Sequence, residues 1–376
     1  MPAADAPDRC AGPHDILHSI DFRLPDGHGP VALAVSGGGD SMALLTLAAK
    51  AAAGDRCRIV VLTVDHGLRP DARGEAEAVA GHCAALGIAH RVLRWTGDKP
   101  VRGLMAAARQ ARYNLLAEAA EQDGCGMVLT GHTLDDQVET LAMRAARGNG
   151  PGLAGIAPAT LHEGRTWFAR PLLGLRRADL RGLLREQGVA WAEDPSNGDD
   201  RFERPRWRSM LAGETQDRVT RLLARAGTEA QLRHSRAAAA AAVIADIRAF
   251  DPGGWPRGLA FLAGGNAAPE IVAEAALQAS RLLGRQAYGP GPGARAAVAA
   301  LLAGPGGKAF TAGGAVFRRM AGRLAVCPDP RGPERRPGLP PLIPGFDYPA
   351  FAALARRLEL DIAPEPGFAV AGLRTV

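Results

Sequence analysis

The chain has 376 residues, of which 47% are hydrophobic and 22% are charged, and its formal net charge is +6. This composition is typical of a soluble globular protein, the length predicts two domains, and the positive charge is compatible with nucleic-acid binding. The sequence has no signal peptide, no apolar run of membrane length and no C-x-x-C pair among its five cysteines, which predicts a cytoplasmic protein without a membrane anchor, zinc site or disulfide framework.

The first predicted strand and helix meet at a glycine-rich turn. Val31–Val35 is an apolar run typical of a buried strand, and the run after Ser41 predicts a helix. The turn combines three glycines with two hydroxyl side chains and one carboxylate: Ser36, Gly37, Gly38, Gly39, Asp40 and Ser41. Glycines let a ligand approach the backbone, and a helix start attracts anions, so we predict a phosphate site. No lysine follows the glycines as in G-x-x-x-x-G-K-[ST] loops, and a tight turn without a ligand is the alternative.

The next elements continue an alternation of strands and helices. Arg58–Val64 predicts a second buried strand, and Asp65 and His66 follow at its carboxyl end, where open α/β sheets bind ligands. A helix that ends near Leu86 and a strand at Arg91–Trp95 come next.

A long helix is predicted for Gly103–Gln122. It carries Arg109 and Arg112, which are three residues apart and therefore share one face of the helix. The spacing leaves two interpretations open, namely solvated surface charges and contacts to phosphate groups.

The segment after the fourth predicted strand, Met127–Thr130, is the second candidate for chemistry. It contains a histidine and three carboxylates: His132, Asp135, Asp136 and Glu139. A helix that begins here gathers the carboxylates near its first turn, where they could hold Mg²⁺ or attract an ammonium group. The alternative is that they only complement the helix dipole.

The following segment completes the alternating pattern. Trp167–Leu173 predicts a fifth strand, Arg177–Gln187 a helix and Asp194–Asn197 a turn. A cluster that suits phosphate or base contacts, but equally an ordinary basic surface, comprises Arg201, Arg204, Arg206, Trp207 and Arg208. Strands that alternate with helices up to this point predict an α/β protein with a doubly wound parallel sheet.

The pattern changes beyond residue 213. We therefore predict a catalytic domain at residues 1–213 and a smaller α+β region at 214–376, which begins with a helical connector at about 217–250. Within this region we expect a loop at Pro252–Gly265, helices at Glu270–Gly284 and Ala294–Ala303, a hairpin within Lys308–Cys327 and an extended linker at Pro328–Pro349.

Several separate motifs in the first half of the chain resemble those of the bacterial tRNA(Ile)-lysidine synthases, a family of the ATP-pyrophosphatase, or PP-loop, superfamily. The motifs are Ser36–Ser41, Val64–Arg69, Ala108–Tyr113, Gly131–Thr140, Arg170–Leu173 and Asp194–Asn197. The first motif indicates only the superfamily, whereas the combination is specific. One position departs from the family pattern: Pro205 stands where the family usually has asparagine, and it lacks both a side-chain amide and a backbone donor.

The resemblance implies an adenine nucleotide alpha hydrolase-like, Rossmann-like fold and a ligase. The family attaches free L-lysine to carbon 2 of the wobble cytidine in the CAU anticodon of tRNA(Ile). ATP first adenylates the 2-oxygen of that base and releases pyrophosphate, and the lysine ε-amine then displaces AMP. The resemblance thus implies ATP, Mg²⁺, L-lysine and tRNA(Ile) as ligands, with residues 214–376 as the tRNA-binding region, and it leaves a homodimer open.

The resemblance also implies roles for the nucleotide-binding residues. The loop Ser36–Ser41 would bind the pyrophosphate part of ATP, and His66 would contact the nucleotide. Asp40 and Asp136 would hold Mg²⁺, because carboxylate oxygens are ligands that this ion prefers.

The remaining roles concern lysine and the tRNA base. The carboxylates at 135, 136 and 139 would orient the metal and the lysine ammonium, and Arg109 and Arg112 would face phosphates or the cytidine. The ε-amine has a reference pKa of about 10.4 and must lose a proton before it attacks. Either a carboxylate or His132 would accept that proton.

Two other functions remain as alternatives. A tRNA cytidine thiolase of the same superfamily shares the loop, but such enzymes usually carry paired cysteines. A nucleotide sensor of the universal-stress type would leave the carboxylates and the basic C-terminal half without a purpose. ATP–pyrophosphate exchange that depends on tRNA would separate an enzyme from a sensor.

Overall fold

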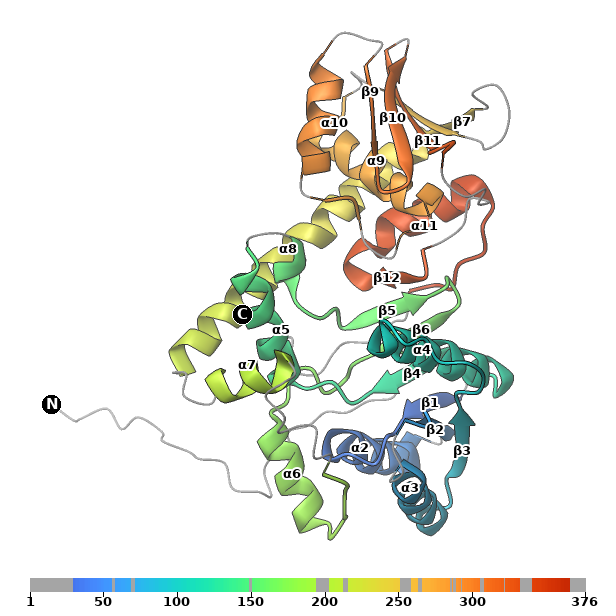
Figure 1. Ribbon diagram of the computed structural model, residues 1–376, viewed down its shortest axis with the longest axis vertical. Helices are drawn as coiled ribbons and strands as arrows, with labels where there is room; N and C mark the ends of the chain where they lie inside the picture. The colour runs from blue at the N-terminus through green and yellow to red at the C-terminus, as the bar shows by residue number, and fades with distance from the viewer. Residues whose placement is uncertain are drawn as a thin grey trace, which may run out of the picture. The chain divides into compact units, whose positions relative to one another are not determined.

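The computed structural model describes most of the chain as two compact units (Figure 1). The described residues are 30–55, 58–68, 72–148, 151–193, 203–211, 216–250, 258–262, 266–284, 286, 289–291, 293–304, 308–320, 322–331 and 340–365. Unit 1 holds the described residues of Met1–Gln137 and Ala169–Arg206, and unit 2 holds those of Val138–Phe168 and Trp207–Pro366. The domain boundary expected at residue 213 stays a prediction.

Unit 1 contains a parallel sheet covered by helices. Its strands are β1 (Val31–Ala34), β2 (Ile59–Asp65), β3 (Ala89–Arg94) and β4 (Met127–Thr130), in the order β4-β1-β2-β3. Its helices are α2 (Gly39–Asp55), α3 (Ala72–Leu86), α4 (Leu104–Gln122) and α6 (Arg177–Glu186). All three strand pairs are parallel. Two further helices, α5 (Leu134–Ala146) and α7 (Glu203–Leu211), begin in unit 1 and end in unit 2.

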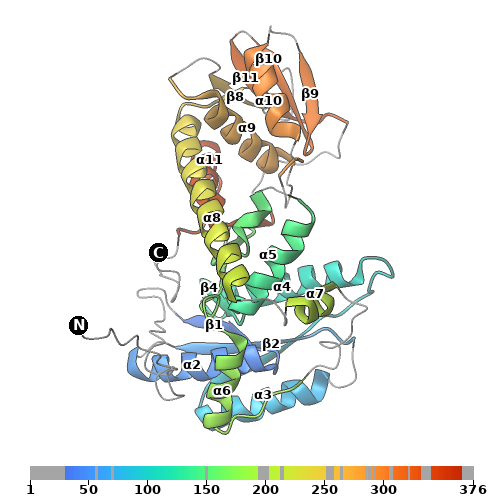
Figure 2. The same cartoon turned by 90° about the vertical axis from the view of Figure 1, so that its left-hand side faces the viewer.

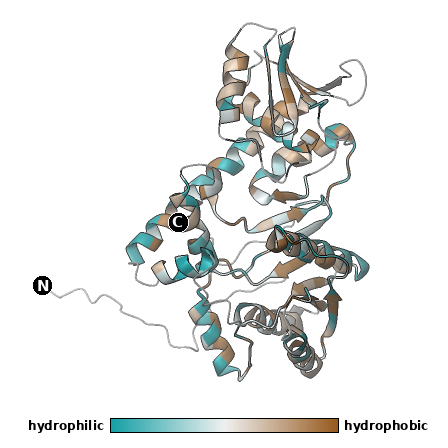
Figure 3. Cartoon of the chain, viewed as in Figure 1, coloured by the Kyte–Doolittle hydropathy of each residue, from teal (hydrophilic) through white to brown (hydrophobic). Residues whose placement is uncertain are grey.

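Strands β1, β2 and β4 of unit 1 are buried on both faces, whereas the edge strand β3 is partly exposed. Helices α2 and α3 cover one face of the sheet and α4 covers the other, as Figures 1 and 2 both show. Every residue of Val31–Val35 is at most 2% exposed. This double cover is the reason why the strands are continuous apolar runs rather than alternating patterns, and Figure 3 shows them mainly in the hydrophobic colour.

The direction of the chain across the sheet reverses between β1 and β4. The chain builds β1, β2 and β3 in one direction, and α4 then returns it to the other side of β1, where β4 forms. Open α/β sheets bind ligands at such a switch point, beyond the carboxyl ends of the strands. The glycine-rich turn follows β1 and the carboxylate segment follows β4, so the two candidate motifs lie at one edge of the sheet.

Unit 2 combines an antiparallel sheet with helices. The sheet has the order β7-β8-β11-β10-β9 and comprises β7 (Arg248–Phe250), β8 (Gly258–Leu262), β9 (Ala309–Ala312), β10 (Ala315–Met320) and β11 (Arg323–Pro328). A second set of neighbouring strands is β12 (Leu342–Pro344), β5 (Ala159–His162) and β6 (Thr166–Ala169). The helices are α8 (Gln216–Ala245), α9 (Pro269–Gly284), α10 (Gly293–Ala303) and α11 (Tyr348–Leu358), with short 3-10 turns η1 (Pro151–Ala154) and η3 (Gly345–Asp347).

The long helix α8 organises the helical part of unit 2. It packs against α9 and α11 (Figure 2). The contact is fixed by Asp347 in η3, whose side chain is fully buried. Its carboxylate accepts hydrogen bonds from Arg233 of α8 at 2.6 and 2.7 Å and from Arg281 of α9 at 2.7 Å. One carboxylate thus joins three elements of the unit.

The structure confirms the parallel α/β fold and most of the predicted elements, and it corrects two of them. The loop expected at Pro252–Gly265 contains strand β8, which pairs with β7 and β11. The extended linker expected at Pro328–Pro349 contains β12, η3 and the start of α11. Both predictions were wrong because glycine and proline flank these short strands, and long-range pairing outweighs that local signal. Arg69, the turn Asp194–Asn197 and Arg201 lie outside the described residues.

Pro205, the residue that departs from the family pattern, lies in the first turn of α7. Pro205 is the third residue of α7 and is buried. Backbone N–H groups in the first turn of a helix have no partner within the helix, so a proline there costs no helical hydrogen bond.

Among the described helices, none is both long enough and apolar enough to cross a membrane.

Candidate functional site

The glycine-rich turn after β1 is held in shape by a serine. The Ser41 hydroxyl donates to the Gly38 carbonyl at 2.8 Å and accepts from the Ser36 backbone N–H at 3.1 Å. Gly37 has a φ of 87°, which favours glycine. Ser41 is buried, whereas Ser36 is exposed. The two hydroxyls of the motif therefore differ: Ser41 supports the loop, whereas the Ser36 hydroxyl, which lies 3.3 Å from that of Ser41, is exposed and can be approached by a ligand.

A second segment supports the turn from the other side. The Ala192 backbone N–H donates to the Gly37 carbonyl at 2.9 Å, and Gly38 forms a bridge with Ala192. A Cβ at Gly39 would lie 3.3 Å from the Trp191 ring, so a side chain there would press on the indole. A Cβ at Gly38 would meet only the Ser36 hydroxyl, at 3.7 Å. The backbone at Gly38 is thus the part of the turn that a phosphate can approach.

The start of α5 is capped by its own third residue. Thr133 precedes the helix, and its backbone N–H and hydroxyl both donate to Asp136 Oδ2, at 2.8 and 2.9 Å. The Asp136 backbone N–H in turn donates to the Thr133 hydroxyl at 3.5 Å, so the arrangement is a capping box with aspartate in the place usually taken by glutamate. Asp136 Oδ2 therefore has a structural role at the start of α5, in keeping with the alternative that the carboxylates only complement the helix dipole. The other oxygen, Oδ1, is directed elsewhere.

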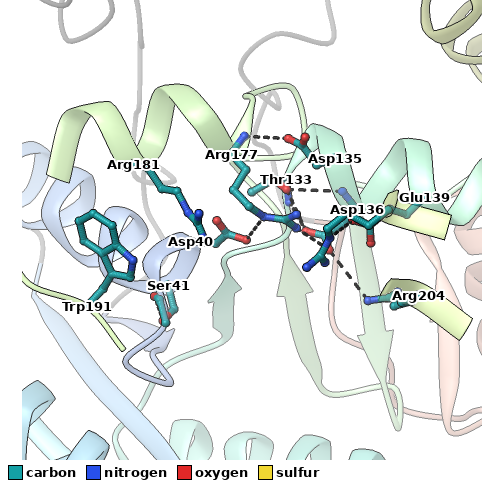
Figure 4. Close-up of polar contacts among 12 residues, drawn as sticks. Asp40, Ser41, Thr133, Asp135, Asp136, Glu139, Arg177, Arg181, Trp191 and Arg204 are labelled. Atoms are coloured by element: carbon teal, nitrogen blue, oxygen red, sulfur yellow. Dashed lines mark hydrogen bonds and ion pairs between the residues drawn. The ribbon is translucent and has the colours of Figure 1, made fainter. Parts of the chain in front are cut away.

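Arg177 gathers the carboxylates from both motifs (Figure 4). Its Nε donates to Asp40 Oδ2 at 2.9 Å, and its Nη2 donates to Asp136 Oδ1 at 3.3 Å. Its backbone N–H donates to Asp135 Oδ2 at 2.7 Å, which satisfies a free donor at the start of α6. Arg204 lies 3.9 Å from Asp136 Oδ1. The three aspartates thus converge on one arginine, but Asp135 meets it through the backbone.

Two physical effects compete at Asp40. Burial raises the pKa of its carboxyl, the Arg177 guanidinium lowers it, and the net direction is upward. The Asp40 and Asp136 side chains are 24% and 12% exposed, and the Arg177 side chain is 16% exposed. Two negative charges at this depth require a cation between them, and in the structure that cation is the guanidinium.

Glu139 belongs to unit 2. It lies on α5 and is 2% exposed. Its Oε1 accepts a hydrogen bond from Arg208 Nε of α7 at 2.8 Å. Removing one partner from a pair of this kind leaves a buried charge uncompensated.

The structure determines the tautomer of His132. The Thr130 hydroxyl donates its one proton to the Ala169 carbonyl at 3.1 Å, and the same oxygen lies 3.0 Å from His132 Nδ1. It can therefore only accept from the ring, so Nδ1 carries the proton and Nε2 is left as an acceptor. Burial lowers the pKa of His132 well below 6.5, and the charges of nearby arginines lower it further. The imidazole is held neutral.

The charges of four arginines act on this neutral histidine: Arg109, Arg112, Arg170 and Arg204. Arg170 is 4% exposed, and its Nη2 lies 3.5 Å from the Tyr113 hydroxyl, which also accepts from Arg109 at 3.3 Å. Burial raises the pKa of Tyr113, but the arginine charges outweigh it and the pKa lies below its ordinary value. The charges of Arg109 and Arg112 thus reach His132, but Arg109 is exposed, and contact of these arginines with phosphate groups stays a prediction.

His66 lies at the carboxyl end of β2, where it stacks edge-on against Trp95 with the ring centroids 6.1 Å apart. Its Nδ1 is buried without a hydrogen-bond partner. Burial lowers the pKa of His66, and Arg112 adds to the effect. A neutral ring with an unused nitrogen suits a hydrogen bond to a bound nucleotide.

The residues present fit a magnesium ion only together with a ligand. In the described part of the chain, no cluster of three or more histidine, cysteine or acidic side chains could hold a metal by itself. Asp40 and Asp136 supply two carboxylates that already share one cation, Arg177. Mg²⁺ is usually bound by one or two carboxylates together with substrate phosphates and waters. The pair therefore fits Mg²⁺ that arrives with ATP.

Sequence reasoning missed three residues that organise this region, namely Thr133, Arg170 and Arg177. Thr133 carried a detectable signal, since a threonine three residues before an acidic residue marks a capping box. Arg170 and Arg177 also carried a signal in the sequence. Arg170 begins the family-like motif Arg170–Leu173, and Arg177 lies shortly after that motif, at the start of a predicted helix. Nothing local showed that they reach the motifs of β1 and β4.

Comparisons with known proteins identify the family of this chain. A model of the PP-loop domain matches residues 15–215. A tRNA(Ile)-lysidine synthase from Mesorhizobium japonicum is 53% identical over 62% of this chain and 52% of that protein. The enzyme of the same name from Methylobacterium nodulans is 41% identical over 81% of this chain and 92% of that protein.

The coverage differs between relatives. The chain spans about half the length of the Mesorhizobium japonicum protein and of the Rhizobium meliloti one, at 52% and 48%. Among solved structures, the U34-tRNA thiolase NcsA from Methanococcus maripaludis gives a TM-score of 0.48 at 15% identity, over 58% of this chain and 77% of that one. That likeness is too distant to bear on function. The chain belongs to the PP-loop proteins and, among them, to the tRNA(Ile)-lysidine synthase family.

Proposed function

We propose that the protein is an ATP-dependent ligase that attaches L-lysine to carbon 2 of the wobble cytidine in tRNA(Ile) with a CAU anticodon. The observation that carries the proposal is the convergence of the glycine-rich turn and the carboxylate segment on Arg177, in a chain of this family. An anion site and an acidic site at one sheet edge suit a reaction between a polyphosphate and an ammonium substrate.

The proposed reaction has two balanced steps. In the first, the 2-oxygen of the cytidine bonds to the α-phosphorus of ATP, and the bond to the pyrophosphate oxygen breaks. In the second, the lysine ε-nitrogen bonds to carbon 2, and the bond from carbon 2 to the phosphorylated oxygen breaks, which releases AMP. The amine gives up a proton in the process.

The turn after β1 is the proposed binding site of the leaving pyrophosphate. The exposed Ser36 hydroxyl and the approachable backbone at Gly38 would donate to its oxygens, and the positive end of α2 would favour the charge. Asp40 and Asp136 would hold Mg²⁺, which neutralises charge on the phosphates when it is bound. His66 would meet the nucleotide through its unused nitrogen.

The acidic residues divide between lysine and the scaffold. We assign the ammonium of lysine to Glu139, while Asp136 serves the helix cap and the metal and Asp135 supports the start of α6. His132 is a poor base here, since proton uptake would create a cation beside four arginines. A carboxylate becomes neutral when it accepts a proton, so it is the better candidate. His132 Nε2 would instead accept a hydrogen bond from an N–H of the substrate.

Helix α8 is the proposed contact to the tRNA backbone in unit 2. Arg218, Arg221 and Arg225 are exposed and recur at helical spacing on one side, while Val219 and Ala226 are buried. Phosphate contacts of this kind fix the orientation of a nucleic acid without reading its sequence. Discrimination of the correct tRNA would require such contacts away from the anticodon.

The decisive experiment measures AMP formation by the purified protein with ATP, L-lysine and a tRNA(Ile) transcript. AMP should appear only when tRNA is present. Asp40→Asn should slow single-turnover AMP formation by about 10²–10³, because one well-placed electrostatic group is lost. The matched control Asp98→Asn alters an exposed aspartate and should keep the wild-type rate. AMP formation without tRNA, or an unaffected Asp40→Asn variant, would contradict the proposal.

A further inference from the structure

The Arg177 guanidinium sits where two carboxylates from different motifs face each other (Figure 4). It reaches Asp40 at 2.9 Å with Nε and Asp136 at 3.3 Å with Nη2. These two carboxylates follow different strands, β1 and β4, and Arg177 comes from the start of α6. A single side chain therefore links three elements of unit 1 through charge.

The scaffold around Arg177 is secured by other bonds. Helix α6 is anchored by the bond from the Arg177 backbone N–H to Asp135, at 2.7 Å. The start of α5 is fixed by the capping box, which uses Asp136 Oδ2, and by the bond from the Leu134 N–H to the Leu175 carbonyl at 2.9 Å. The guanidinium instead takes Asp136 Oδ1, the oxygen that the capping box leaves over. Its bonds are thus additional to those that shape the two helices.

The same two carboxylates are the ones that fit a divalent cation. Mg²⁺ requires oxygen ligands at about 2.0–2.1 Å in octahedral geometry. A guanidinium that donates to both carboxylates fills the space between them and neutralises one of their two charges. The arginine and the metal therefore cannot occupy this position at the same time.

We propose that Arg177 holds the place of the divalent cation in the nucleotide-free protein, so that metal binding requires its displacement. The inference rests on the proposed function for the assignment of the metal to Asp40 and Asp136. ATP resolves the competition, because its phosphates bring further oxygen ligands for the metal and give the displaced guanidinium a new anionic partner. Arg177 then couples metal binding to nucleotide binding, and the coupling acts equally in both directions.

The test measures Mn²⁺ binding to the full-length protein without nucleotide, by electron paramagnetic resonance of free Mn²⁺. Arg177→Gln should bind Mn²⁺ at least about tenfold more tightly than the wild type, since two carboxylates lose their competing cation. Adding Asp40→Asn to this variant should abolish the gain. The matched control Arg181→Gln removes a charge one turn further along α6, near Asp40 but not between the carboxylates, and should change the affinity less than about threefold.

A purely structural Arg177 gives different results. In that case Arg177→Gln lowers the thermal midpoint, and its Mn²⁺ affinity equals that of the wild type or falls below it, which overturns the inference. If Arg177→Gln fails to fold, Arg177→Lys serves instead: a single ammonium cannot span both carboxylates as the fork does, so tighter Mn²⁺ binding is still expected, and unchanged binding overturns the inference.

The inference and the proposed function can fail separately. Unchanged Mn²⁺ affinity in a protein that forms AMP with tRNA overturns only the role of Arg177. Tighter Mn²⁺ binding by Arg177→Gln, combined with no tRNA-dependent AMP formation by the wild type, overturns only the proposed ligase activity.

Discussion

Replacing Gly131 with alanine should displace the glycine-rich turn from the carboxylate segment. Gly131 lies just after β4, and a Cβ there would lie 2.9 Å from the Asp40 carbonyl oxygen and 3.1 Å from Ser41 Cα. These are backbone atoms at the start of α2, so they cannot rotate away. Ordinary contact begins near 3.4 Å, and relief of the clash requires a shift of about 0.5 Å.

The expected effects follow from that shift. Overpacking of this kind typically costs about 1–3 kcal/mol. In a unit of this size the thermal midpoint falls by about 2–4 °C per kcal/mol. Because Asp40 moves relative to the residues after β4, tRNA-dependent AMP formation should slow by roughly tenfold, less than the 10²-fold expected for a 1 Å misplacement.

The assays are a thermal unfolding curve and single-turnover AMP formation on the same preparation. Gly126→Ala is the matched control, since Gly126 precedes the same strand and a Cβ there meets nothing within 4 Å. A Gly131→Ala protein with wild-type midpoint and rate would refute the reasoning. Equal losses in both variants would do the same.

Three further predictions test other parts of the structure. Asp347→Asn leaves the buried Arg281 and the half-buried Arg233 without their carboxylate and should cost about 3–5 kcal/mol in thermal unfolding, whereas Glu77→Gln at an exposed pair should not shift the midpoint. Burial raises the pKa of Asp347, but Arg233 and Arg281 outweigh it, so this stabilisation should be complete above the unfolded pKa of about 3.9 and disappear as the pH falls through the lower folded pKa. His132 should titrate well below pH 6.5 by NMR, with His132→Asn identifying its signal, and a midpoint at or above 6.5 would contradict the neutral ring. Replacing Arg218, Arg221 and Arg225 with glutamine should weaken tRNA binding. The slope of log K against log salt concentration should become shallower by up to about 0.7–0.9 for each lost phosphate contact, and an unchanged slope would remove α8 from the interface.

The sequence was sufficient to predict the parallel sheet of unit 1. The strands β1, β2 and β4 are continuous apolar runs because helices cover both faces of the sheet, and such runs are visible without a structure. Parallel strands place their carboxyl ends at one edge, but the turn after β1 and the segment after β4 are neighbours only because β4 pairs with β1, which the structure shows and the sequence does not. The short strands β8 and β12 were missed, since their pairing partners are distant in sequence.

The division of labour within the site could not be predicted from spacing. Asp135 and Asp136 are consecutive and equally acidic, yet one supports the backbone of α6 and the other shares its oxygens between a helix cap and Arg177. Arg177 is 137 positions from Asp40, and only the packing of α6 beside α2 brings them together. The neutral state of His132 likewise depends first on its burial and then on the charges of arginines from distant segments.

The most direct measurement of the central claim is mass spectrometry of nucleosides from tRNA(Ile) treated with the protein, ATP and L-lysine. We predict that the wobble cytidine gains the mass of lysine less one water, with one AMP formed per modified tRNA, and that a transcript with a different wobble base is unchanged. An unmodified wobble cytidine, or one that gains sulfur when a sulfur donor is supplied, would contradict the account.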